Sequence, residues 1–489
     1  MLTAEAQENA VRELVRVAPV AVELGERFAA AGHALHLVGG SVRDALLGRL
    51  GDDLDLTTDA RPERVLEIVS GWAEATWDTG IAYGTVGVAR RGFKLEVTTY
   101  RAEAYRSDSR NPEVTYGTSL VDDLARRDLT VNAMAVALPH WTAPDAFVDP
   151  YGGRDDLAAG LLRTPGPPED SFADDPLRML RVARFVAQLG FRVEPGAVAA
   201  LSAMADRLEI IAKERVKDEL SKLLLGAHPR RGLELLVDTG LADSVLPELP
   251  ALRLEIDEHH QHKDVYQHTL QVLERAVRLE EHGPDLVLRL AAVLHDVGKP
   301  RTRRHEPGGG VSFHHHEVVG AAMARKRLRA LTFGKDVVEP VALLIELHLR
   351  FHGYGTGASW TDSAVRRYVT DAGDQLERLH RLVRSDCTTR NRRKAAQLQA
   401  AYDDLERRIV RLRAQEELSR IRPDLPGERV MELLAVPPGP VVGRALKHLL
   451  ALRMEHGPLG EERAEAELLA WARAEGLDVP EAGGAVSSA

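Results

Sequence analysis

The spacing of hydrophobic and polar positions changes about a third of the way along the 489-residue chain. Residues up to about Ala30 have the period of an amphipathic helix, and short apolar or alternating runs bounded by turn residues follow. Helical patterns lie between some of these runs, so the sequence predicts a mixed α/β domain that ends near Gly153. The expected strands are "HALHLVGG", "DLDLTT", "GTVGVARRG", "FKLEVTTYR", "LTVNAMAVAL" and "AFVDP", and the expected helices between them are "SVRDALLG" and "RPERVLEIVSGW".

From Asp174 onward the β pattern disappears and long amphipathic helical patterns replace it. Three of these patterns end at a glycine, as helices commonly do. They are "PLRMLRVARFVAQLG", "ERVKDELSKLLLG" and "RRGLELLVDTGL". A second helical unit, from about Ile256 to Asp386, is distinguished by its histidines. The predicted fold class is therefore α+β, with a mixed α/β head followed by all-helical regions.

Composition sets the broad class. A content of 44% hydrophobic and 28% charged residues is that of an ordinary soluble protein. No apolar run approaches membrane-spanning length, and the first residues are acidic and amphipathic, unlike a signal peptide. A single cysteine, Cys387, excludes an intramolecular disulfide framework and suits a reducing cytoplasm. The formal charge of -10 argues against a protein coated in nucleic acid but leaves room for a local basic groove.

The stretch "VGGSVRDALLGR" has the composition of a phosphate-binding turn. Gly39 and Gly40 let the backbone come close to a ligand, and the start of the helix after them favours an anion. Arg43 adds a charged fork suited to phosphate. We expect Ser41 to cap this helix, with Asp44 completing a capping box.

The carboxylates of "DDLDLTT" follow soon after. In an alternating strand, Asp53 and Asp55 lie on the same face and the leucines on the other. Two adjacent carboxylates repel each other, so a fold tolerates them best where they share divalent cations. A phosphate-binding turn beside such a pair indicates phosphoryl or nucleotidyl transfer with two metal ions. The alternative is a solvated turn with surface acids.

A second polar pattern lies in "DDPLRMLRVAR". Asp175, Arg178, Arg181 and Arg184 are three residues apart, so they form a slanting stripe on a helix while the apolar residues between them can reach a core. By itself such a stripe is usually an exposed face with weak ion pairs.

Histidine and aspartate residues recur in the second helical unit. An adjacent His-Asp pair closes one helical pattern, with a histidine on an earlier helix and an aspartate on a later one. Imidazole and carboxylate together suit a transition metal, whose bound water becomes a nucleophile. We expect His314 and His315 to lie in an adjacent loop. The candidate ligands are His268, His295, Asp296, His316, His348 and Asp386.

The ordered motifs carry a family resemblance over roughly the first half of the chain. "LVGGSVRDALLGR", "DDLDLTTDA", "RRDLTVNAMA", "DDPLRMLRVARF" and "ERVKDELSKLL" resemble the class II tRNA nucleotidyltransferase and bacterial poly(A) polymerase family, relatives of the DNA polymerase beta superfamily. The resemblance implies a polymerase beta-like head. It also implies that Gly39, Gly40 and Arg43 hold a triphosphate and that Asp53 and Asp55 hold Mg²⁺. Glu96 has the strand alternation of a third acidic group near them, and a core-edge glutamate is the alternative.

The resemblance also implies that Asp175 and Arg178 recognise the incoming base. Cytosine and adenine both present an amino donor beside an unprotonated ring nitrogen, which a carboxylate and a guanidinium match. Guanine and uracil present a carbonyl beside an N–H, so donors would face donors. One pair of side chains can therefore select C and A without a nucleic-acid template. Asp174 stands where the family usually has Glu, which leaves the role of that first acid open.

Further nucleotide contacts follow from the same resemblance. It assigns Arg127 to phosphate or base and Asp128 with Asn132 to the ribose, while Arg181 and Arg184 continue the base-recognising stripe. The segment Tyr105 to Gly117 is polar and rich in turn residues. We interpret it as a mobile loop near the nucleotide, or alternatively as an ordinary surface loop.

The second helical unit resembles the HD phosphohydrolase domain. The match implies His268, His295, Asp296 and Asp386 as core ligands of a divalent transition metal. The remaining two histidines, His316 and His348, are then possible ligands of a second metal. The alternative is an HD remnant with a purely structural role.

Two helical stretches are basic in this acidic chain. From Pro176 to Arg231 there are 11 Lys and Arg against 6 Asp and Glu, a charge of +5. From Thr388 to Asp424 there are 10 against 6, a charge of +4. Both suit contact with structured RNA, although solvated helix faces remain an alternative for the second.

These expectations give one organisation of the chain. A nucleotidyltransferase head at 1–153 precedes a helical neck at 154–250 that recognises the base and contacts RNA. An HD phosphohydrolase-like domain at 251–390 and a helical, RNA-contacting tail at 391–489 follow. The sequence has no feature that indicates an oligomeric state.

The expected function is the addition of C, C and A to the tRNA 3′ end from CTP and ATP, with release of pyrophosphate and no membrane partner. A poly(A) polymerase on the same scaffold is one alternative. The others are an HD phosphohydrolase with a regulatory nucleotidyltransferase half, and a non-catalytic RNA-binding module.

Overall fold

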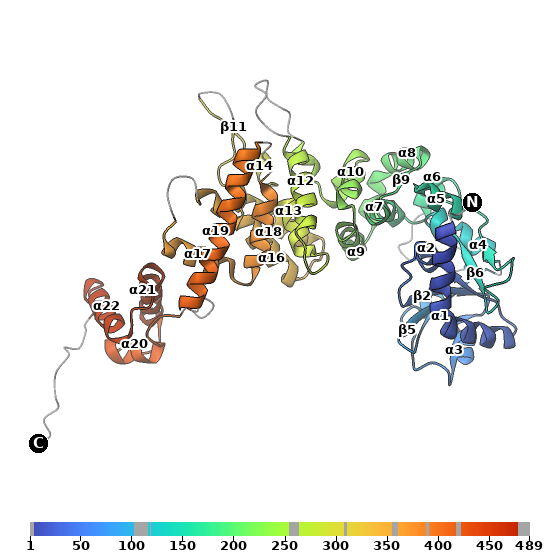
Figure 1. Ribbon diagram of the computed structural model, residues 1–489, viewed down its shortest axis with the longest axis horizontal. Coiled ribbons are helices and arrows are strands. Elements are labelled where there is room, and N and C mark those ends of the chain that lie inside the picture. Colours follow the sequence, from blue (N-terminus) through green and yellow to red (C-terminus); the bar gives the residue numbers. More distant parts are fainter. Residues whose placement is uncertain are drawn as a thin grey trace, which may run out of the picture. The chain divides into compact units, whose positions relative to one another are not determined.

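The computed structural model describes residues 4–101, 116–117, 119–253, 264–307, 311–354, 360–387, 391–416 and 422–477 (Figure 1). The chain forms two compact units. The first consists of residues 1–253 with the short segments 284–286 and 327–333, and the second contains the remainder. Each unit is described by itself.

A seven-stranded mixed sheet forms the head of the first unit, in the order β3-β4-β5-β2-β1-β6-β7. Only the β2–β5 pair among these neighbours is parallel. The predicted α/β head is therefore confirmed. The strands are β1 (Leu35–Val38), β2 (Asp53–Thr58), β3 (Ala75–Trp77), β4 (Thr85–Arg90), β5 (Phe93–Thr99), β6 (Ala135–Leu138) and β7 (Phe147–Val148).

Helices and 3-10 turns join these strands, and α1 and α3 pack against the sheet. The predicted N-terminal helix is α1, which continues through Pro19. Buried Leu54 and Leu56 of β2 point into the core, as the alternation of that strand requires. The elements are α1 (Ala4–Ala30), α2 (Gly40–Leu46), α3 (Pro62–Val69), η1 (Ile81–Tyr83), α4 (Leu120–Ala125), η2 (Thr130–Asn132) and α5 (Gly153–Ala159).

The sequence prediction was wrong at "LTVNAM", where the expected strand begins with the 3-10 turn η2. Tertiary hydrogen bonds explain the difference. The Thr130 N–H donates to the Arg163 carbonyl at 2.8 Å, and the Thr130 hydroxyl donates to the Asp156 carboxylate at 2.6 Å. These partners replace a strand ladder, so the strand starts only at Ala135.

Several short strands were not predicted. The edge strand β3 has three residues, and its Trp77 ring lies where a Cβ on Gly87 of β4 would be, so the glycine makes room for it. Beyond Asp174, where no β structure was expected, β9 (Arg192–Val193) pairs with β8 (Leu161–Leu162), and β10 (Arg304–His305) pairs with β11 (Val311–Ser312). Runs of two residues are too short to show a period.

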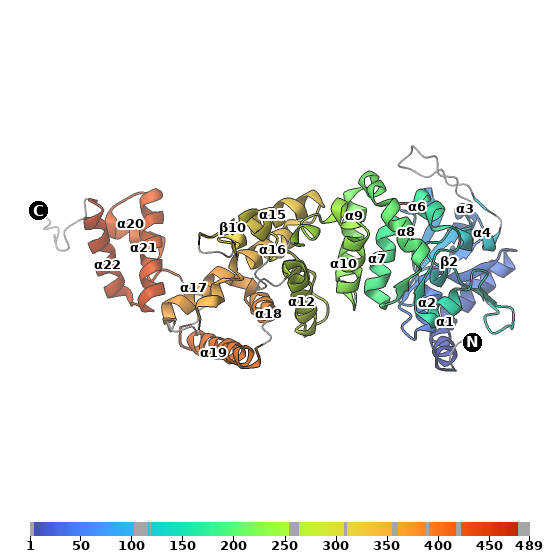
Figure 2. The same ribbon diagram turned by 90° about the horizontal axis from the view of Figure 1, so that it is seen from above.

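A group of helices completes the first unit, and α7 packs against both α9 and α10, as both views show (Figures 1 and 2). Gly190 ends α7 in the left-handed conformation, with φ of 71°. The elements are α6 (Pro168–Asp174), α7 (Leu177–Leu189), α8 (Pro195–Ala203), η3 (Ala205–Ile210), α9 (Lys213–Leu224), α10 (Pro229–Asp238), α11 (Leu241–Val245) and η4 (Pro250–Leu252).

The second unit is helical apart from the β10–β11 ribbon in the residues described. Helices α20, α21 and α22 share a small hydrophobic core around Val430, Leu449 and Leu468. No described helix is long and apolar enough to span a membrane. The elements are α12 (Val265–Arg278), α13 (Leu286–Leu294), α14 (Lys299–Thr302), α15 (His316–Ala330), α16 (Lys335–Leu347), η5 (Arg350–Gly353), α17 (Asp362–Ala372), η6 (Gly373–Gln375), α18 (Leu376–Asp386), α19 (Arg392–Glu416), α20 (Gly427–Leu434), α21 (Pro440–His456) and α22 (Glu461–Ala474).

Candidate functional sites

One pocket in the first unit, of about 920 Å³, brings together every residue predicted from the sequence to act on the nucleotide. Its walls come from the β1–α2 turn, from β2 and β5, from the segment around η2, and from α7 and α9. The predicted residues that line it are Gly39, Gly40, Arg43, Asp53, Asp55, Arg127, Asp128, Asn132, Asp175, Arg178, Arg181 and Arg184.

The glycine turn is closely packed against charged side chains. Gly39 has φ of +66°, and a Cβ at this position would lie 2.5 Å from Nη1 of Arg127. At Gly40 the corresponding atom would lie 3.7 Å from a carboxylate oxygen of Asp55. The missing side chains therefore let the backbone turn directly beneath Arg127 and beside the carboxylate pair.

The predicted capping box was wrong. Helix α2 begins at Gly40, Gly39 occupies the capping position, and no side chain caps it. Because the helix starts before Ser41, this residue lies in the first turn and faces β2, where its hydroxyl accepts a hydrogen bond from the Asp55 N–H at 2.9 Å. Asp44 instead forms an ion pair with Arg43 at 2.8 Å. Ser41 thus fastens the glycine turn to the strand that carries the carboxylates.

The carboxylate pair lies on the open face of β2, as predicted from the alternation. In the parallel register with β5, Asp55 lies opposite Glu96. Partial burial raises the pKa of Glu96, and the nearby charges of Asp55 and Asp53 raise it further. Although solvent reaches Asp55, enclosure by the pocket raises its pKa, which Arg127 and Arg43 partly counteract. Asp55 and Glu96, whose charged forms are disfavoured, lie beside Asp53, and such a crowded group of acids fits a divalent cation.

The geometry at these carboxylates is open. The described residues do not bring three ligand atoms of this site within 4.8 Å of one another, in contrast to the second unit. Mg²⁺ commonly uses one or two carboxylates and completes its coordination with water and substrate phosphates. The arrangement fits that mode of binding.

A buried polar network links the head to α7. Nη1 of Arg43 donates to Oδ1 of Asn132 at 2.5 Å, and the amide of Asn132 donates to Oδ1 of Asp128 at 2.8 Å. Oδ2 of Asp128 accepts from Nε of Arg181 at 2.7 Å. Burial disfavours the charged form of Asp128, but Arg181 and Asn132 outweigh it and hold the pKa of this carboxyl below its ordinary value. The ribose contact that the resemblance implies for Asp128 and Asn132 stays a prediction.

The polar stripe of α7 is not an exposed face. Arg178 and Arg184 are only 9% and 8% exposed. Arg178 donates to the Ser171 hydroxyl at 3.0 Å and to the Arg126 carbonyl at 2.7 Å, and Arg184 forms a buried ion pair with Glu219 at 3.2 Å. The solvated face that such spacing usually indicates is therefore excluded, because the three arginines of α7 form a wall of the pocket. The prediction that Asp175 lies on the same helix was wrong, since α7 begins at Leu177 and Asp175 precedes it in extended backbone.

Sequence reasoning missed several charged residues of the pocket. Arg215 and Lys222 have the spacing i and i+7 in "ERVKDELSKLL", with Glu219 between them, so they lie on one face of α9. That periodicity was the available signal. Asp123 is buried and lies 3.3 Å from Arg127, and the i and i+4 spacing of these two residues was the available signal. Of the predicted loop Tyr105 to Gly117, residues 105–115 lie outside the described residues.

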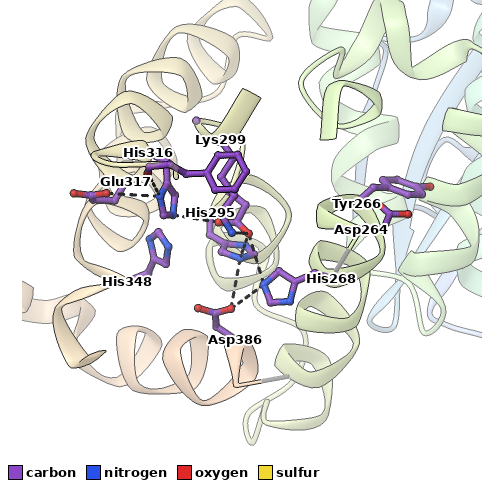
Figure 3. A network of polar contacts seen from close by, with 12 residues as sticks. Asp264, Tyr266, His268, His295, Lys299, His316, Glu317, His348 and Asp386 are labelled. Carbon is purple, nitrogen blue, oxygen red and sulfur yellow. Dashed lines mark hydrogen bonds and ion pairs between the residues drawn. The ribbon is translucent and has the colours of Figure 1, made fainter. Parts of the chain in front are cut away.

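The second unit brings all six predicted metal ligands together (Figure 3). They come from α12, the end of α13, α15, α16 and α18, and they form two groups of three whose ligand atoms lie within 4.8 Å of one another. His314 and His315 lie in the turn before α15, as expected. One group is His268, His295 and Asp386, and the other is Asp296, His316 and His348.

The histidines are oriented as metal ligands are. Nδ1 of His295 lies 2.9 Å from the Ala292 carbonyl, and the same atom of His316 and of His348 lies 2.8 Å and 2.6 Å from a backbone carbonyl. A donated Nδ1–H leaves a lone pair on Nε2, which is the tautomer that binds metal. Nε2 of His295 and of His316 is buried without a hydrogen bond of acceptable geometry. These buried nitrogens and the adjacent carboxylates fit a divalent metal.

The surroundings of His348 favour the neutral form of its imidazole, which is the form that binds metal. Burial, followed by repulsion from His295, lowers the pKa of His348 to about 4, so its imidazole is neutral. Lys299 lies 2.7 Å from Asp296, which also approaches His295 at 3.2 Å and His316 at 3.3 Å. Asp296, which belongs to the second group, therefore also approaches His295 of the first group.

Comparison with known domains agrees with this division. The Poly A polymerase head domain matches residues 35–163, the probable RNA and SrmB-binding site of polymerase A matches 190–252, and the HD domain matches 265–412. The pocket is lined by residues of the first two regions and of the segment between them, and the histidine cluster lies in the third. The chain thus combines a polymerase-type head domain with an HD domain.

Relatives define the family more closely. An A-adding tRNA nucleotidyltransferase of Deinococcus radiodurans is 32% identical over 446 residues, which is 89% of this chain and 95% of that protein. A CCA-adding enzyme of Limosilactobacillus fermentum is 42% identical over 216 residues, which is 44% of this chain and 52% of that protein. This chain matches just over half the length of several such CCA-adding enzymes. The chain belongs to the family of CCA-adding and A-adding tRNA nucleotidyltransferases.

Solved structures of CCA-adding enzymes resemble this chain over almost its whole length. The crystal structure of the Bacillus stearothermophilus CCA-adding enzyme in complex with CTP has a TM-score of 0.67 and 28% identity, covering 93% of this chain and 98% of that one. The Thermotoga maritima CCA-adding enzyme complexed with tRNA shares the fold, with a TM-score of 0.56 and 17% identity over 95% of this chain and 98% of that one.

The glycine turn generates a first prediction. Gly39→Ala should lower the affinity for nucleoside triphosphate at least tenfold, because a methyl group would displace Arg127 and the positive φ strains any L side chain by about 1 kcal/mol or more. Gly32→Ala is the matched control, since Gly32 also has a positive φ but no atom lies within 4 Å of its Cβ position. Equal triphosphate binding by the two variants, measured by calorimetry, would contradict the role of the turn.

Proposed function

We propose that this protein adds C, C and A to the 3′ end of tRNA from CTP and ATP and releases pyrophosphate. The observation that carries the proposal is the single pocket in which the glycine turn, the carboxylates and the α7 stripe meet. The names of the relatives support tRNA as the partner and CTP and ATP as substrates. The two basic stretches predicted from the sequence would contact the RNA backbone.

Each wall of the pocket has a role in this proposal. Asp53 and Asp55, with Glu96 beside them, would hold Mg²⁺, which when bound lowers the pKa of the attacking 3′ hydroxyl and neutralises triphosphate charge. Arg127 lies against the glycine turn, where it would bind phosphate. Arg178 is fixed by Ser171 and the Arg126 carbonyl, so its remaining donors are preorganised toward a ring nitrogen of the base.

Asp175 would complete base recognition by accepting from the amino group of cytosine or adenine. Arg181 and Arg184 would support base recognition indirectly, through ion pairs within the protein. Each is tied to a buried carboxylate, Asp128 and Glu219 respectively, which fixes the wall that faces the base. Selection of C and A then depends on side chains that the fold holds in place before the nucleotide arrives.

A second candidate function, addition of the terminal A alone, is favoured by the relative that matches almost the whole chain. Three tRNA substrates distinguish the two functions: one lacking CCA, one ending in C and one ending in CC. Each is incubated with CTP or with ATP. Full CCA addition predicts that CTP extends the first two substrates and that ATP extends only the third. Extension of the CC-ending tRNA alone would identify an A-adding enzyme, and long A tracts would indicate a poly(A) polymerase.

The carboxylate assignment generates a prediction. Asp53→Ala or Asp55→Ala should reduce nucleotide incorporation by several orders of magnitude while tRNA binding persists, since the metal ions act on the triphosphate and the hydroxyl. Incorporation is measured on the extended tRNA and binding by gel shift. Asp52→Ala is the matched control, because Asp52 is an exposed neighbour paired with Arg16. Turnover near the wild-type rate in either active-site variant would contradict the assignment.

We also propose that the HD cluster binds a divalent transition metal and hydrolyses phosphoesters. The six convergent ligands and the buried Nε2 atoms of His295 and His316 support this proposal against a purely structural role. When bound, the metal would supply an activated water. Lys299, beside Asp296, would contribute a positive charge near the substrate phosphate.

The double variant His295→Ala/Asp296→Ala should lose bound metal and hydrolysis of phosphomonoesters and cyclic phosphates while nucleotide addition continues. Metal content is measured by elemental analysis and both activities on one preparation. Parallel loss of both activities in a folded variant would show that the cluster is a shared structural element. Hydrolysis that persists would show that the cluster is not its source.

A further inference from the structure

The carboxylate of Asp175 is held from two sides. Asp175 occupies the short joint between α6 and α7, where its backbone is extended, with φ of -140° and ψ of 100°. Oδ1 accepts from the Leu177 N–H at 3.1 Å. Oδ2 accepts from Nη2 of Arg215 at 2.9 Å. Two donors on different oxygens fix the plane of the carboxylate, whereas one donor would leave it free to rotate.

Arg215 reaches this carboxylate from α9, a different helix. Its side chain is 52% exposed, that of Asp175 is 17% exposed, and both line the pocket. One turn further along α9, Glu219 holds Arg184 of α7. Helix α9 therefore contacts Arg184 of α7 by a buried ion pair, and Asp175 in the joint before α7 by a solvent-facing ion pair.

The two predicted base-recognising residues are fixed in different ways. Arg178 is held by neutral groups, the Ser171 hydroxyl and the Arg126 carbonyl, and is buried. Asp175 is held by a charged, half-exposed side chain. A carboxylate oxygen has two lone pairs, so Oδ2 can accept from Arg215 and from the amino group of a base together. A carboxylate can only accept, so its direction toward the base decides which donors it can meet.

We infer that Arg215 is a positioning residue that determines nucleotide selectivity by orienting Asp175. It sets the direction of the acceptor that distinguishes cytosine from uracil and adenine from guanine. This inference rests on the proposed function, because it assumes that the pocket incorporates C and A. Nucleotide selection would then also depend on a residue of α9, and the spacing of residues within α7 does not reveal that residue.

Arg215→Gln tests the inference. It should lower the preference for CTP over UTP, and for ATP over GTP, by about two- to fivefold, which is the upper part of the range expected for one partly exposed ion pair. Arg215→Lys should keep most of the preference because the charge and one donor remain. Lys217→Gln, which changes a cation of α9 that does not line the pocket, should leave the preference unchanged. The readout is kcat/KM for the four triphosphates on a tRNA acceptor.

A double-mutant cycle separates an indirect role from a direct one. If Arg215 acts through Asp175, then Arg215→Gln should cause no further loss of preference in an Asp175→Ala background. A further loss there would show that Arg215 contacts the base itself and would overturn the positioning role. A uniform drop in kcat/KM with intact preference in Arg215→Gln would also overturn it.

These outcomes are distinct from failure of the proposed function. A wild-type protein that incorporates neither C nor A would refute the proposed function. A selective wild-type protein whose Asp175→Ala variant keeps full selectivity would refute base recognition by Asp175, and the inference with it. Selectivity lost in Arg215→Gln and restored in Arg215→Lys would support the inference, and because the comparison is a ratio, partial unfolding of either variant would not alter it.

Discussion

The ion pair between buried Asp128 and partly exposed Arg181 is the contact on which the shape of the pocket depends. Asp128 follows α4 in the head, Arg181 lies in the middle of α7, and their closest atoms are 2.5 Å apart. Loss of Arg181 would leave the buried carboxylate of Asp128 without its ion partner, which is destabilising for a buried charge. The pair therefore holds the head sheet, with its carboxylates, at a fixed distance from the helix that faces the base.

The same pair organises its neighbours. Asn132 bridges Asp128 to Arg43, and Arg43 lies over the ring of Phe185 on α7 at 5.0 Å. The guanidinium groups of the pocket are thus held by protein acceptors and an aromatic face before any substrate is bound. A pocket whose cations are already positioned spends less free energy on ordering side chains when a polyanionic nucleotide enters. Fixed arginines also keep opposite charge close to Asp53 and Asp55, which would otherwise repel the triphosphate.

Spacing along the sequence predicted which residues form the sites far better than it predicted how they pair. The alternation in "DLDL" and the three-residue interval of the stripe are properties of a single element, so the sequence contains them completely. The contact between Ser41 and the Asp55 backbone joins two elements, and a local rule assigned Ser41 to a cap instead. The 3-10 turn at Thr130 has the same cause, because Asp156 and Arg163 lie far along the chain. Tertiary partners overrode local preference in both cases.

The two candidate metal sites differ in how much of the coordination the protein supplies, and this difference has a functional meaning. The HD cluster brings six candidate ligands together, with imidazoles oriented by backbone carbonyls, so the protein alone would supply most of the coordination of a bound ion. The head offers carboxylates on one strand face, with Glu96 on the next strand, and leaves the remaining coordination to phosphate oxygens. A site of that kind binds its metal together with the nucleotide. Under the proposed function, metal affinity in the head would therefore be linked to triphosphate binding, whereas the HD cluster would retain its ion independently of the nucleotide.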